Sequence, residues 1–330
     1  MYGWGGSTSD WKKPGKYGFD SARSPYLDKL AKDASAKGPR TYTRRDEPDM
    51  KLVDAKGKTI STDSENPLVV AVDVTGSMSS WPAEIFDRLP LLYQTLSQYK
   101  PDLEICFAAI GDANSDRFPL QVNDFAKGVG LEDKLKALCP EGGGGGQISE
   151  SYELFGYYML EHCNMPKAKS PFLLVYGDEK FYNEVKPEQV SHYIGDTLQA
   201  PLNSADVWKK LQQKFNVYFL QKRYGDENDS ITDAAVKQHW ANALGKQNII
   251  DLPSCDRAVD VAMGLVAKQW GEFKDFKENL SARQDEDEAK TVYSSLRFVD
   301  GDPSAKSVVS GKNLTKRTMS LSELGKKKTK

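Results

Sequence analysis

A group of oxygen-bearing side chains follows the first long apolar run of the sequence. Residues 68–72 read LVVAV, and the next five, 73–77, read DVTGS. Asp73, Thr75 and Ser77 alternate along the chain, so a compact turn can aim one carboxylate and two hydroxyls at a common point. Gly76, which lacks a β-carbon, lets the backbone fold closely enough for this. Oxygen ligands of this kind suit a hard cation such as Mg²⁺. The same residues could instead cap the N-terminus of the following helix.

The elements around this turn alternate between strands and helices. The uninterrupted apolar run into Asp73 is typical of a strand buried on both faces of a parallel sheet. The segment PLQV (119–122) is interpreted as an antiparallel edge strand. Further strands are expected at 104–112, 172–178, 216–221 and 248–252, and helices at about 83–98, 131–138, 149–161 and 256–270. This order predicts an α/β fold with a doubly wound, mostly parallel sheet, helices on both faces and one antiparallel edge strand, which is a Rossmann-like arrangement.

Two strand ends and a glycine run are expected at one edge of this sheet. In a doubly wound sheet, ligands bind beyond the carboxyl ends of the strands. Asp73 ends one strand and Asp178 ends another, FLLVYGD, so the two carboxylates should converge. Between them, five glycines (142–146) precede Gln147 and a predicted helix, and their backbone could lie against an ion or its water shell.

Taken in this order, the three loops resemble the metal-ion-dependent adhesion site (MIDAS) of von Willebrand factor A (VWA) domains. The resemblance covers about residues 67–270 and implies a VWA fold with bound Mg²⁺ or Mn²⁺. The sequence departs from the family in its second loop, where Gln147 and Ser149 stand in place of a threonine, and in its third, which reads YGDE. The implied metal ligands are Asp73, Thr75, Ser77, Asp178 and either Gln147 or Ser149. The implied supporting residues are Asp112 and Glu179, with the loop glycines Gly76, Gly144, Gly145 and Gly146.

Other interpretations of these loops stay open on the sequence alone. A glycine run before a helix can cradle a phosphate. Here, no Gly-Lys-Ser/Thr ending follows it, and Glu150 and Glu153 would repel an anion. Asp112 and Asp116 could form a second cation site, but such a cluster is more often a turn held by Asx hydrogen bonds.

The composition sets the domain organisation and the compartment that we expect. The chain has 330 residues, and its N-terminus contains no apolar signal-peptide segment. Its four cysteines stand far apart without a C-x-x-C pair, which favours reduced thiols and a cytoplasmic location. We expect an N-terminal extension (1–65) packed on the domain or on a partner, a VWA-like domain (66–282), and a polar C-terminal extension with a basic tail (283–330). Within the extensions, a helix is expected at about 24–36, a strand or hairpin at 50–60, and short extended pieces at 294–300 and 306–310.

The charge is distributed unevenly along the chain. Residues 1–58 hold 13 basic and 8 acidic side chains, and residues 305–330 hold 8 basic and 1 acidic, in a chain with a net charge of −2. The central part therefore carries −14. An acidic body repels phosphates, so a nucleic-acid-binding core is not expected. No apolar run is long enough to span a membrane.

The resemblance and the ligand chemistry together predict a binding function. Mg²⁺ prefers six ligands, so a partner's Asp or Glu can complete its coordination. We therefore expect an intracellular VWA-type interaction module in a multiprotein complex, and the resemblance to microbial members implies a AAA+ ATPase of the MoxR kind as a possible partner. The alternatives are a Mg²⁺-dependent hydrolase and a structural VWA domain without metal. No enzyme is expected, because none of the three histidines falls in the metal loops and no hydrolase motif is present.

Overall fold

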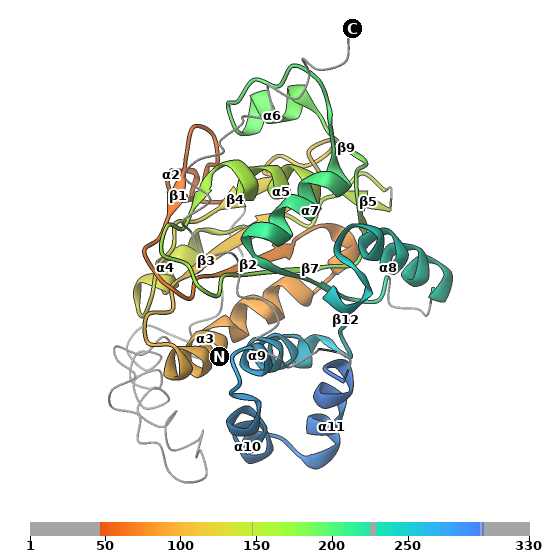
Figure 1. Ribbon diagram of the computed structural model, residues 1–330. Coiled ribbons are helices and arrows are strands. Elements are labelled where there is room, and N and C mark those ends of the chain that lie inside the picture. Colours follow the sequence, from red (N-terminus) through yellow and green to blue (C-terminus); the bar gives the residue numbers. More distant parts are fainter. Residues whose placement is uncertain (1–46, 147, 225–228, 298, 300–330) are drawn as a thin grey trace, which may run out of the picture.

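A computed structural model describes residues 47–146, 148–224, 229–297 and 299. Its centre is a six-stranded sheet with the strand order β12-β11-β7-β2-β3-β4 (Figure 1). The strands span Leu68–Asp73 (β2), Ile105–Ile110 (β3), Leu120–Val122 (β4), Phe172–Gly177 (β7), Asn216–Gln221 (β11) and Ile249–Asp251 (β12). β3 and β4 pair antiparallel, and the other neighbours are parallel. The predicted doubly wound, mostly parallel sheet with one antiparallel edge strand is confirmed.

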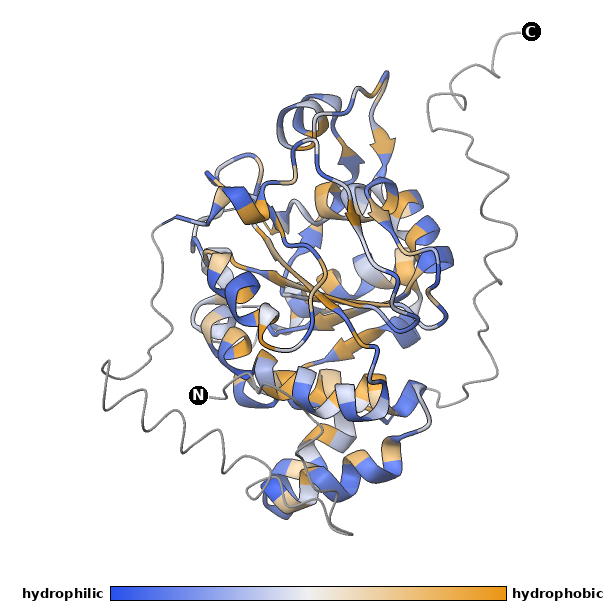
Figure 2. Cartoon of the chain, turned by 90° about the vertical axis from the view of Figure 1, so that its left-hand side faces the viewer, coloured by the Kyte–Doolittle hydropathy of each residue, from blue (hydrophilic) through white to orange (hydrophobic). Residues whose placement is uncertain are grey.

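Helices cover both faces of this sheet (Figure 1). Their apolar sides face the strands and their polar sides face outward (Figure 2). The helices of one face are α3 (Trp81–Tyr99), α4 (Gly130–Ala137), α9 (Ala258–Gln269), α10 (Phe273–Arg283) and α11 (Glu286–Ser295). Those of the other face are α5 (Tyr152–Glu161), α6 (Pro187–Tyr193), α7 (Ser204–Lys214) and α8 (Ser230–Leu244).

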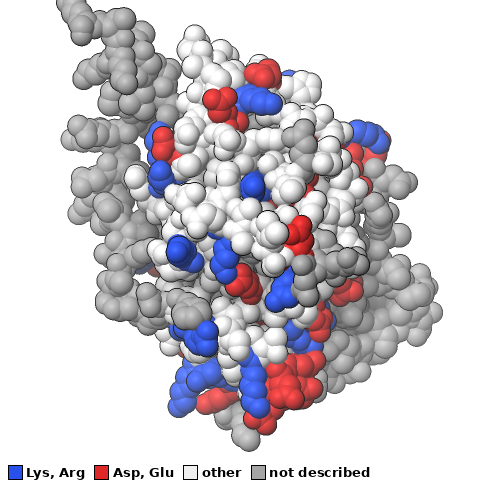
Figure 3. Space-filling model, turned by 90° about the vertical axis from the view of Figure 1, so that its right-hand side faces the viewer, with Lys and Arg blue, Asp and Glu red and all other residues white. Residues whose placement is uncertain are grey.

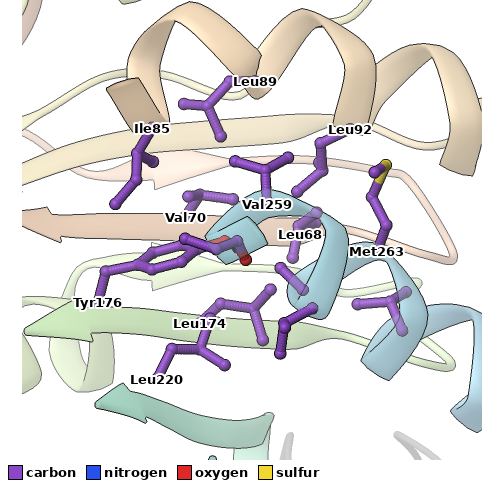
Figure 4. Packing of buried hydrophobic residues seen from close by; sticks show 14 of the residues in the cluster. Leu68, Val70, Ile85, Leu89, Leu92, Leu174, Tyr176, Leu220, Val259 and Met263 are labelled. Carbon is purple, nitrogen blue, oxygen red and sulfur yellow. Dashed lines mark hydrogen bonds between the residues drawn. The ribbon is translucent and has the colours of Figure 1, made fainter. Parts of the chain in front are cut away.

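The central strand β2 contributes to two separate hydrophobic cores. Leu68, Val70 and Val72 pack in one core, and Val69 and Ala71 pack in the other, because successive side chains of a strand point to opposite faces. All five are fully buried. The continuous apolar run is thus explained by burial on both faces. Figure 4 shows the first core, where leucines of α3 and apolar residues of α9 pack over β2, β7 and β11.

The segment before β2 packs against both cores. It holds helix α2 (Met50–Val53) and strand β1 (Ile60–Ser61), which pairs in parallel with β6 (Cys163–Asn164). Val53 belongs to one core and Ile60 to the other. The strand or hairpin expected at 50–60 was wrong over Met50–Val53, where Asp49 caps a helical turn by accepting from the N–H of Lys51, whereas Ile60 does begin strand β1. The helix expected at 24–36 lies outside the described residues.

Helices α10 and α11 lie on the same face of the sheet as α3 and α9, and they continue the packed structure beyond residue 282. A buried ion network ties them to α9: Asp260 accepts from Arg283 at 3.1 Å and from the Gln284 amide at 2.5 Å. α11 begins with a capping box between Asp285 and Glu288. An extended piece was expected at 294–300. For the residues of this range that the structure describes, the prediction was wrong, because Ser294 and Ser295 form the end of α11. The piece at 306–310 lies outside the described residues, and the domain boundaries stay predictions.

Short pairs of strands lie around the main sheet. β5 (Ser149–Glu150) pairs in parallel with β8 (Lys180–Phe181), and β9 (Glu184–Val185) pairs antiparallel with β10 (Leu202–Asn203). The helix expected from residue 149 begins only at Tyr152, because β5 takes the two residues before the turn. The four cysteines are free, and Cys106, Cys139 and Cys163 are buried as expected for core thiols.

Candidate functional site

The turn after β2 gathers the first three predicted ligands. The buried Asp73 carboxylate accepts from the Thr75 N–H at 2.9 Å and from the Thr75 hydroxyl at 2.6 Å, both through Oδ1. The Thr75 and Ser77 hydroxyls lie 3.3 Å apart. A short 3₁₀ turn, η2 (Gly76–Met78), starts within this stretch and produces the compact bend. The alternating spacing therefore brings the three oxygens together, as the sequence predicts.

The loop after β7 brings in a second acidic side chain. The Ser77 hydroxyl donates to Asp178 Oδ1 at 2.9 Å, so the carboxyl ends of β2 and β7 meet. Asp178 Oδ2 accepts from the Lys222 ammonium at 3.0 Å. This ammonium also donates to the carbonyls of Ser77 at 3.0 Å and Arg223 at 2.9 Å, and its side chain is 2% exposed. A buried lysine is thus a fixed part of the site.

The glycine run lies directly against the turn after β2. The Gly142 N–H donates to the Val74 carbonyl at 2.8 Å, and the Gly76 N–H donates to the Gly143 carbonyl at 2.5 Å. A β-carbon on Gly143 would lie 2.1 Å from Asp116 Oδ1, so a side chain there would displace the Asp116 carboxylate. Gly144 has a φ of +121°, a conformation that side chains rarely adopt. The glycines therefore permit a close contact between two loops.

Two further carboxylates point into the site, and the sequence did not single out the first of them. Glu150 lies beside the glycine loop, since a β-carbon on Gly144 would be 3.3 Å from Glu150 Oε1. Glu179 follows Asp178 and is 2% exposed. Among the described residues, Glu150 Oε2 and Glu179 Oε2 are buried without a hydrogen-bond partner. Such orphaned oxygens are costly to bury unless a cation or a proton compensates them.

The electrostatics of the site reflect this excess of carboxylates. Burial, followed by the Asp178 charge, raises the pKa of Asp73 to about 7. Burial, with the charges of Asp73 and Asp178, raises the pKa of Glu179 to about 8. Burial, with the charges of Asp73 and Glu179, raises the pKa of Glu150 to about 11. Burial also raises the pKa of Asp178, although Lys222 acts in the opposite direction. One ammonium cannot balance four carboxylates, so without a cation Glu150 and Glu179, whose pKa values lie above 7, hold protons near neutral pH.

Tyr152, at the start of α5, is a second residue that sequence reasoning missed. Its hydroxyl donates to Asp73 Oδ2. Burial, with the neighbouring Asp73 charge, raises the pKa of Tyr152, so the phenol stays protonated and remains a donor. A β-carbon on Gly177 would lie 2.2 Å from this hydroxyl, so the glycine at the end of β7 makes room for it.

Asp112 and Asp116 form a hydrogen-bonded turn behind the glycine loop. Asp112 Oδ1 accepts from the Asn114 N–H at 3.1 Å and from its amide nitrogen at 2.8 Å, and Oδ2 accepts from the Tyr182 hydroxyl at 3.2 Å. Asp116 accepts from the Asp112 N–H and the Gly144 N–H, both at 2.7 Å. These are the bonds of an Asx-type turn. Asp116 therefore ties the glycine loop to the end of β3.

The sequence predicts Gln147 or Ser149 as the metal ligand of the second loop. Gln147 lies outside the described residues. The Ser149 hydroxyl donates to the Ile148 carbonyl at 2.7 Å, and Ser149 pairs with Lys180 in the small sheet. It is Glu150, the next residue, that lies beside Gly144 and the Asp73 charge.

The donor set fits a hard divalent cation in its chemistry. All of its members offer oxygen, and two buried carboxylate oxygens lack a partner. The ligands are not preformed as a metal cluster: no group of three or more His, Cys, Asp or Glu side chains in the described part of the chain is arranged to hold an ion. Tyr152 and Lys222 instead engage Asp73 and Asp178. A cation entering the site would therefore compete with these two donors.

Comparisons with known proteins reach only the level of the fold. No protein-family model and no curated protein matches the sequence. Among solved structures, the chain is similar to the pilus adhesin SpaC from Lactobacillus rhamnosus GG in its open conformation (12% identity, TM-score 0.44, covering 67% of this chain and 31% of SpaC). It is also similar to proximal thread matrix protein 1 from the mussel byssus (12%, TM-score 0.41, 64% and 49%) and to the SpRpn10 VWA domain (11%, TM-score 0.37, 59% and 94%). The chain thus spans about a third of the length of SpaC.

These likenesses carry no argument about activity or partners. The strand order and the helices on both faces show a doubly wound, Rossmann-like fold. Within the described residues, no helix combines the length and apolar character needed to cross a membrane.

Proposed function

We propose that the chain is a VWA-type protein-interaction module that binds Mg²⁺ or Mn²⁺ at the carboxyl edge of its sheet. The cation would be held by Asp73, Thr75, Ser77 and Asp178, with Glu179 and either Glu150 or the second-loop residues Gln147 and Ser149 beside them. The observation that carries this proposal is the excess of acidic groups: four buried carboxyl groups, two with unpartnered oxygens, gather around the site, and the Lys222 ammonium pairs with Asp178 alone among them. When bound, the ion supplies positive charge and an open coordination position.

A binding role is favoured over hydrolysis by what surrounds the site. The three histidines of the chain make their contacts elsewhere: His162 with Asp196, His192 with Tyr193, and His239 with Phe181. Tyr152, whose raised pKa keeps it protonated, is a hydrogen-bond donor and not a base. The neighbouring residues therefore orient and neutralise carboxylates, which is what a docking site requires.

The partner that fits this site presents an Asp or Glu side chain. Its carboxylate would complete the coordination of the ion and form a charge-reinforced bond. We propose that the partner belongs to an intracellular multiprotein complex, and a AAA+ ATPase of the MoxR kind is the partner that the sequence resemblance suggests.

Paramagnetic relaxation tests this docking chemistry without a known partner. N-acetyl-aspartate amide would be mixed with the full chain in the presence of Mn²⁺, and the line widths of its methylene protons measured. We expect strong broadening that excess Mg²⁺ removes, and no such effect for N-acetyl-asparagine amide. Equal broadening of both probes, or the same broadening with the Asp73→Asn chain, would contradict carboxylate docking at this site.

A further inference from the structure

Lys222 shows how the acidic site binds an ammonium group. Its Nζ donates to Asp178 Oδ2 at 3.0 Å and to the carbonyls of Ser77 at 3.0 Å and Arg223 at 2.9 Å. It also lies 5.9 Å from the centre of the Trp81 ring, which is within reach of a cation–π contact. An ammonium has three donors, and all three are used here. The site therefore accepts a primary ammonium as the partner of a carboxylate.

Two other carboxyl groups of the site lack a partner of this kind. Glu150 and Glu179 are each 2% exposed, and among the described residues one oxygen of each is buried without a hydrogen-bond partner. The charge of Glu179 acts on Glu150, so the two groups lie close together. Hydrogen bonds from an ammonium to a carboxylate are about twice as strong as those between neutral groups. A second ammonium would therefore compensate both side chains at once.

The segment 305–330 supplies ammonium groups in excess. It holds 8 basic side chains, of which seven are lysines, and 1 acidic side chain, whereas the central part of the chain carries −14. Opposite net charges attract this segment to the acidic body. At about 3.3 Å per residue, residues 300–330 can extend over as much as about 100 Å. The segment is therefore long enough to reach the site of its own chain.

The described part of the chain brings this segment to the side of the site. An open groove of about 1220 Å³ runs along β12. Its lining includes Arg297, close to the last described residue, and also Arg223, which directly follows Lys222. Residues 300–330 thus follow a part of the chain that shares a groove with the loop of Lys222. The path to the acidic site is short in comparison with their extended length.

The acidic residues at the start of α11 are a poorer destination for these lysines. On the face viewed in Figure 3, basic and acidic side chains are interspersed, with acidic ones gathered toward the lower end. Lys290 already pairs with Glu286 at 2.9 Å and with Asp287 at 3.5 Å, and both carboxylates are exposed. Ion pairs in water contribute little, whereas buried carboxyl oxygens without a partner are costly. The two glutamates of the site therefore gain more from an added ammonium.

We propose that a lysine of the segment 305–330 binds the acidic site of its own chain when no divalent ion is bound. Its ammonium would donate to Glu150 and Glu179, as Lys222 donates to Asp178. The segment would then cover the position that a divalent ion and a partner's carboxylate need, and so act as an autoinhibitory ligand. The contact itself needs no metal, whereas its inhibitory effect rests on the proposed function.

A peptide titration in EDTA tests the contact without a metal. The receptor is the full chain with the seven lysines of 305–330 replaced by glutamine, and the probe is a fluorescein-labelled synthetic peptide of residues 305–330, followed by anisotropy. We expect this peptide to bind, and a peptide with glutamine at the seven positions to bind at least tenfold more weakly. The unsubstituted chain, whose own segment occupies the site, should bind the probe at least fivefold more weakly than the receptor does. No binding to the receptor, or equal affinity of the two chains, would overturn the proposal.

Matched substitutions in the same receptor locate the contact. Glu150→Gln with Glu179→Gln should weaken the probe at least tenfold. Glu286→Gln with Asp287→Asn removes two carboxylates from the start of α11 and should leave the affinity within twofold. Melting temperatures would verify that both variants fold, and if the first does not, each of its single substitutions should weaken the probe at least threefold. Equal losses in the two pairs, or no loss in the first, would exclude binding at the acidic site.

Sedimentation and calorimetry separate the remaining outcomes. The unsubstituted chain in EDTA should sediment as a monomer, and a dimer that the seven lysine substitutions dissociate would overturn the assignment to the same chain in favour of a second copy. Mg²⁺ should bind the substituted chain at least fivefold more tightly than the parent, and equal affinities would contradict the inhibitory effect. If neither chain binds Mg²⁺, the proposed function fails and the inhibitory effect with it, while the peptide titration in EDTA still decides whether the contact exists.

Discussion

Lys222 is the residue whose replacement reports most sharply on the charge balance of the acidic site. Its ammonium contacts Asp178 and two carbonyls, and the ion pair is almost completely buried. Lys222→Met keeps an unbranched apolar chain of similar length but removes the charge. Without a divalent ion, Asp178 would keep only the Ser77 hydroxyl as a donor among these contacts.

The size of the effect follows from the cost of an uncompensated buried charge. Removing one partner of a buried ion pair costs about 3–5 kcal/mol. At about 2–4 °C per kcal/mol for a domain of this size, the melting temperature in EDTA should fall by about 6–20 °C. A divalent ion would restore the missing charge, and recovery of about 3 kcal/mol corresponds to about 100-fold tighter binding. We therefore expect Mg²⁺ to bind Lys222→Met about 10- to 100-fold more tightly than the parent.

Thermal melts and calorimetric titrations on the full chain measure both effects. Lys214→Met is the matched control, because Lys214 is also largely buried but donates only to the carbonyls of Met159 and Leu160. It should lower stability without changing Mg²⁺ affinity. If Lys222→Met melted like the parent in EDTA and bound Mg²⁺ no more tightly, the ammonium would not be the counter-charge of the site, and the reasoning would be refuted.

Three other predictions follow from the same contacts. Asp73→Asn should raise the melting temperature in EDTA, because it removes a buried charge near Asp178, and should abolish the shift caused by Mg²⁺; a variant that still responds to Mg²⁺ would place the ion elsewhere. The raised pKa values of Asp73 (about 7) and Glu179 (about 8) mean that the folded state holds more protons than the unfolded state, whose carboxyl pKa values are about 4. In the metal-free protein, this contribution to the free energy of unfolding should be largest below about pH 4 and should be lost as pH rises to 7–8, by up to about 1.4 kcal/mol per pH unit for each proton. Saturating Mg²⁺ should flatten the curve. Urea titrations from pH 5 to 9 would show no such fall if these carboxylates were ionised throughout. Arg283→Met should lower stability by about 1–3 kcal/mol, because it removes one donor from the buried Asp260, which keeps Arg257 and Gln284. Limited proteolysis should then show faster cleavage in α10 than in the parent.

The parts of the site that strand polarity determines could be predicted from the sequence. Parallel strands place their carboxyl ends at one edge, so the convergence of Asp73 and Asp178 follows from the two apolar runs that precede them. Lys222 could have been found by the same argument. It directly follows NVYFLQ, and the register Gln221↔Gly177 places it opposite Asp178.

The second loop could not be resolved in this way. Successive residues of an extended segment point to opposite sides, so a one-residue difference decides whether Ser149 or Glu150 enters the site. The glycine run before them gives no periodicity from which to count. The segment at 50–60 was misinterpreted for a related reason, since four residues of α2 are too few to distinguish a helical from an alternating pattern.

The most direct test of the central claim is a calorimetric titration of the full chain with Mg²⁺ and Mn²⁺ at pH 7.5, with Asp73→Asn alongside. The account predicts one ion per chain, a rise in melting temperature on binding, and the loss of both in Asp73→Asn. The absence of binding in the parent and also in Lys222→Met, where no ammonium competes, would contradict a cation site at this edge of the sheet.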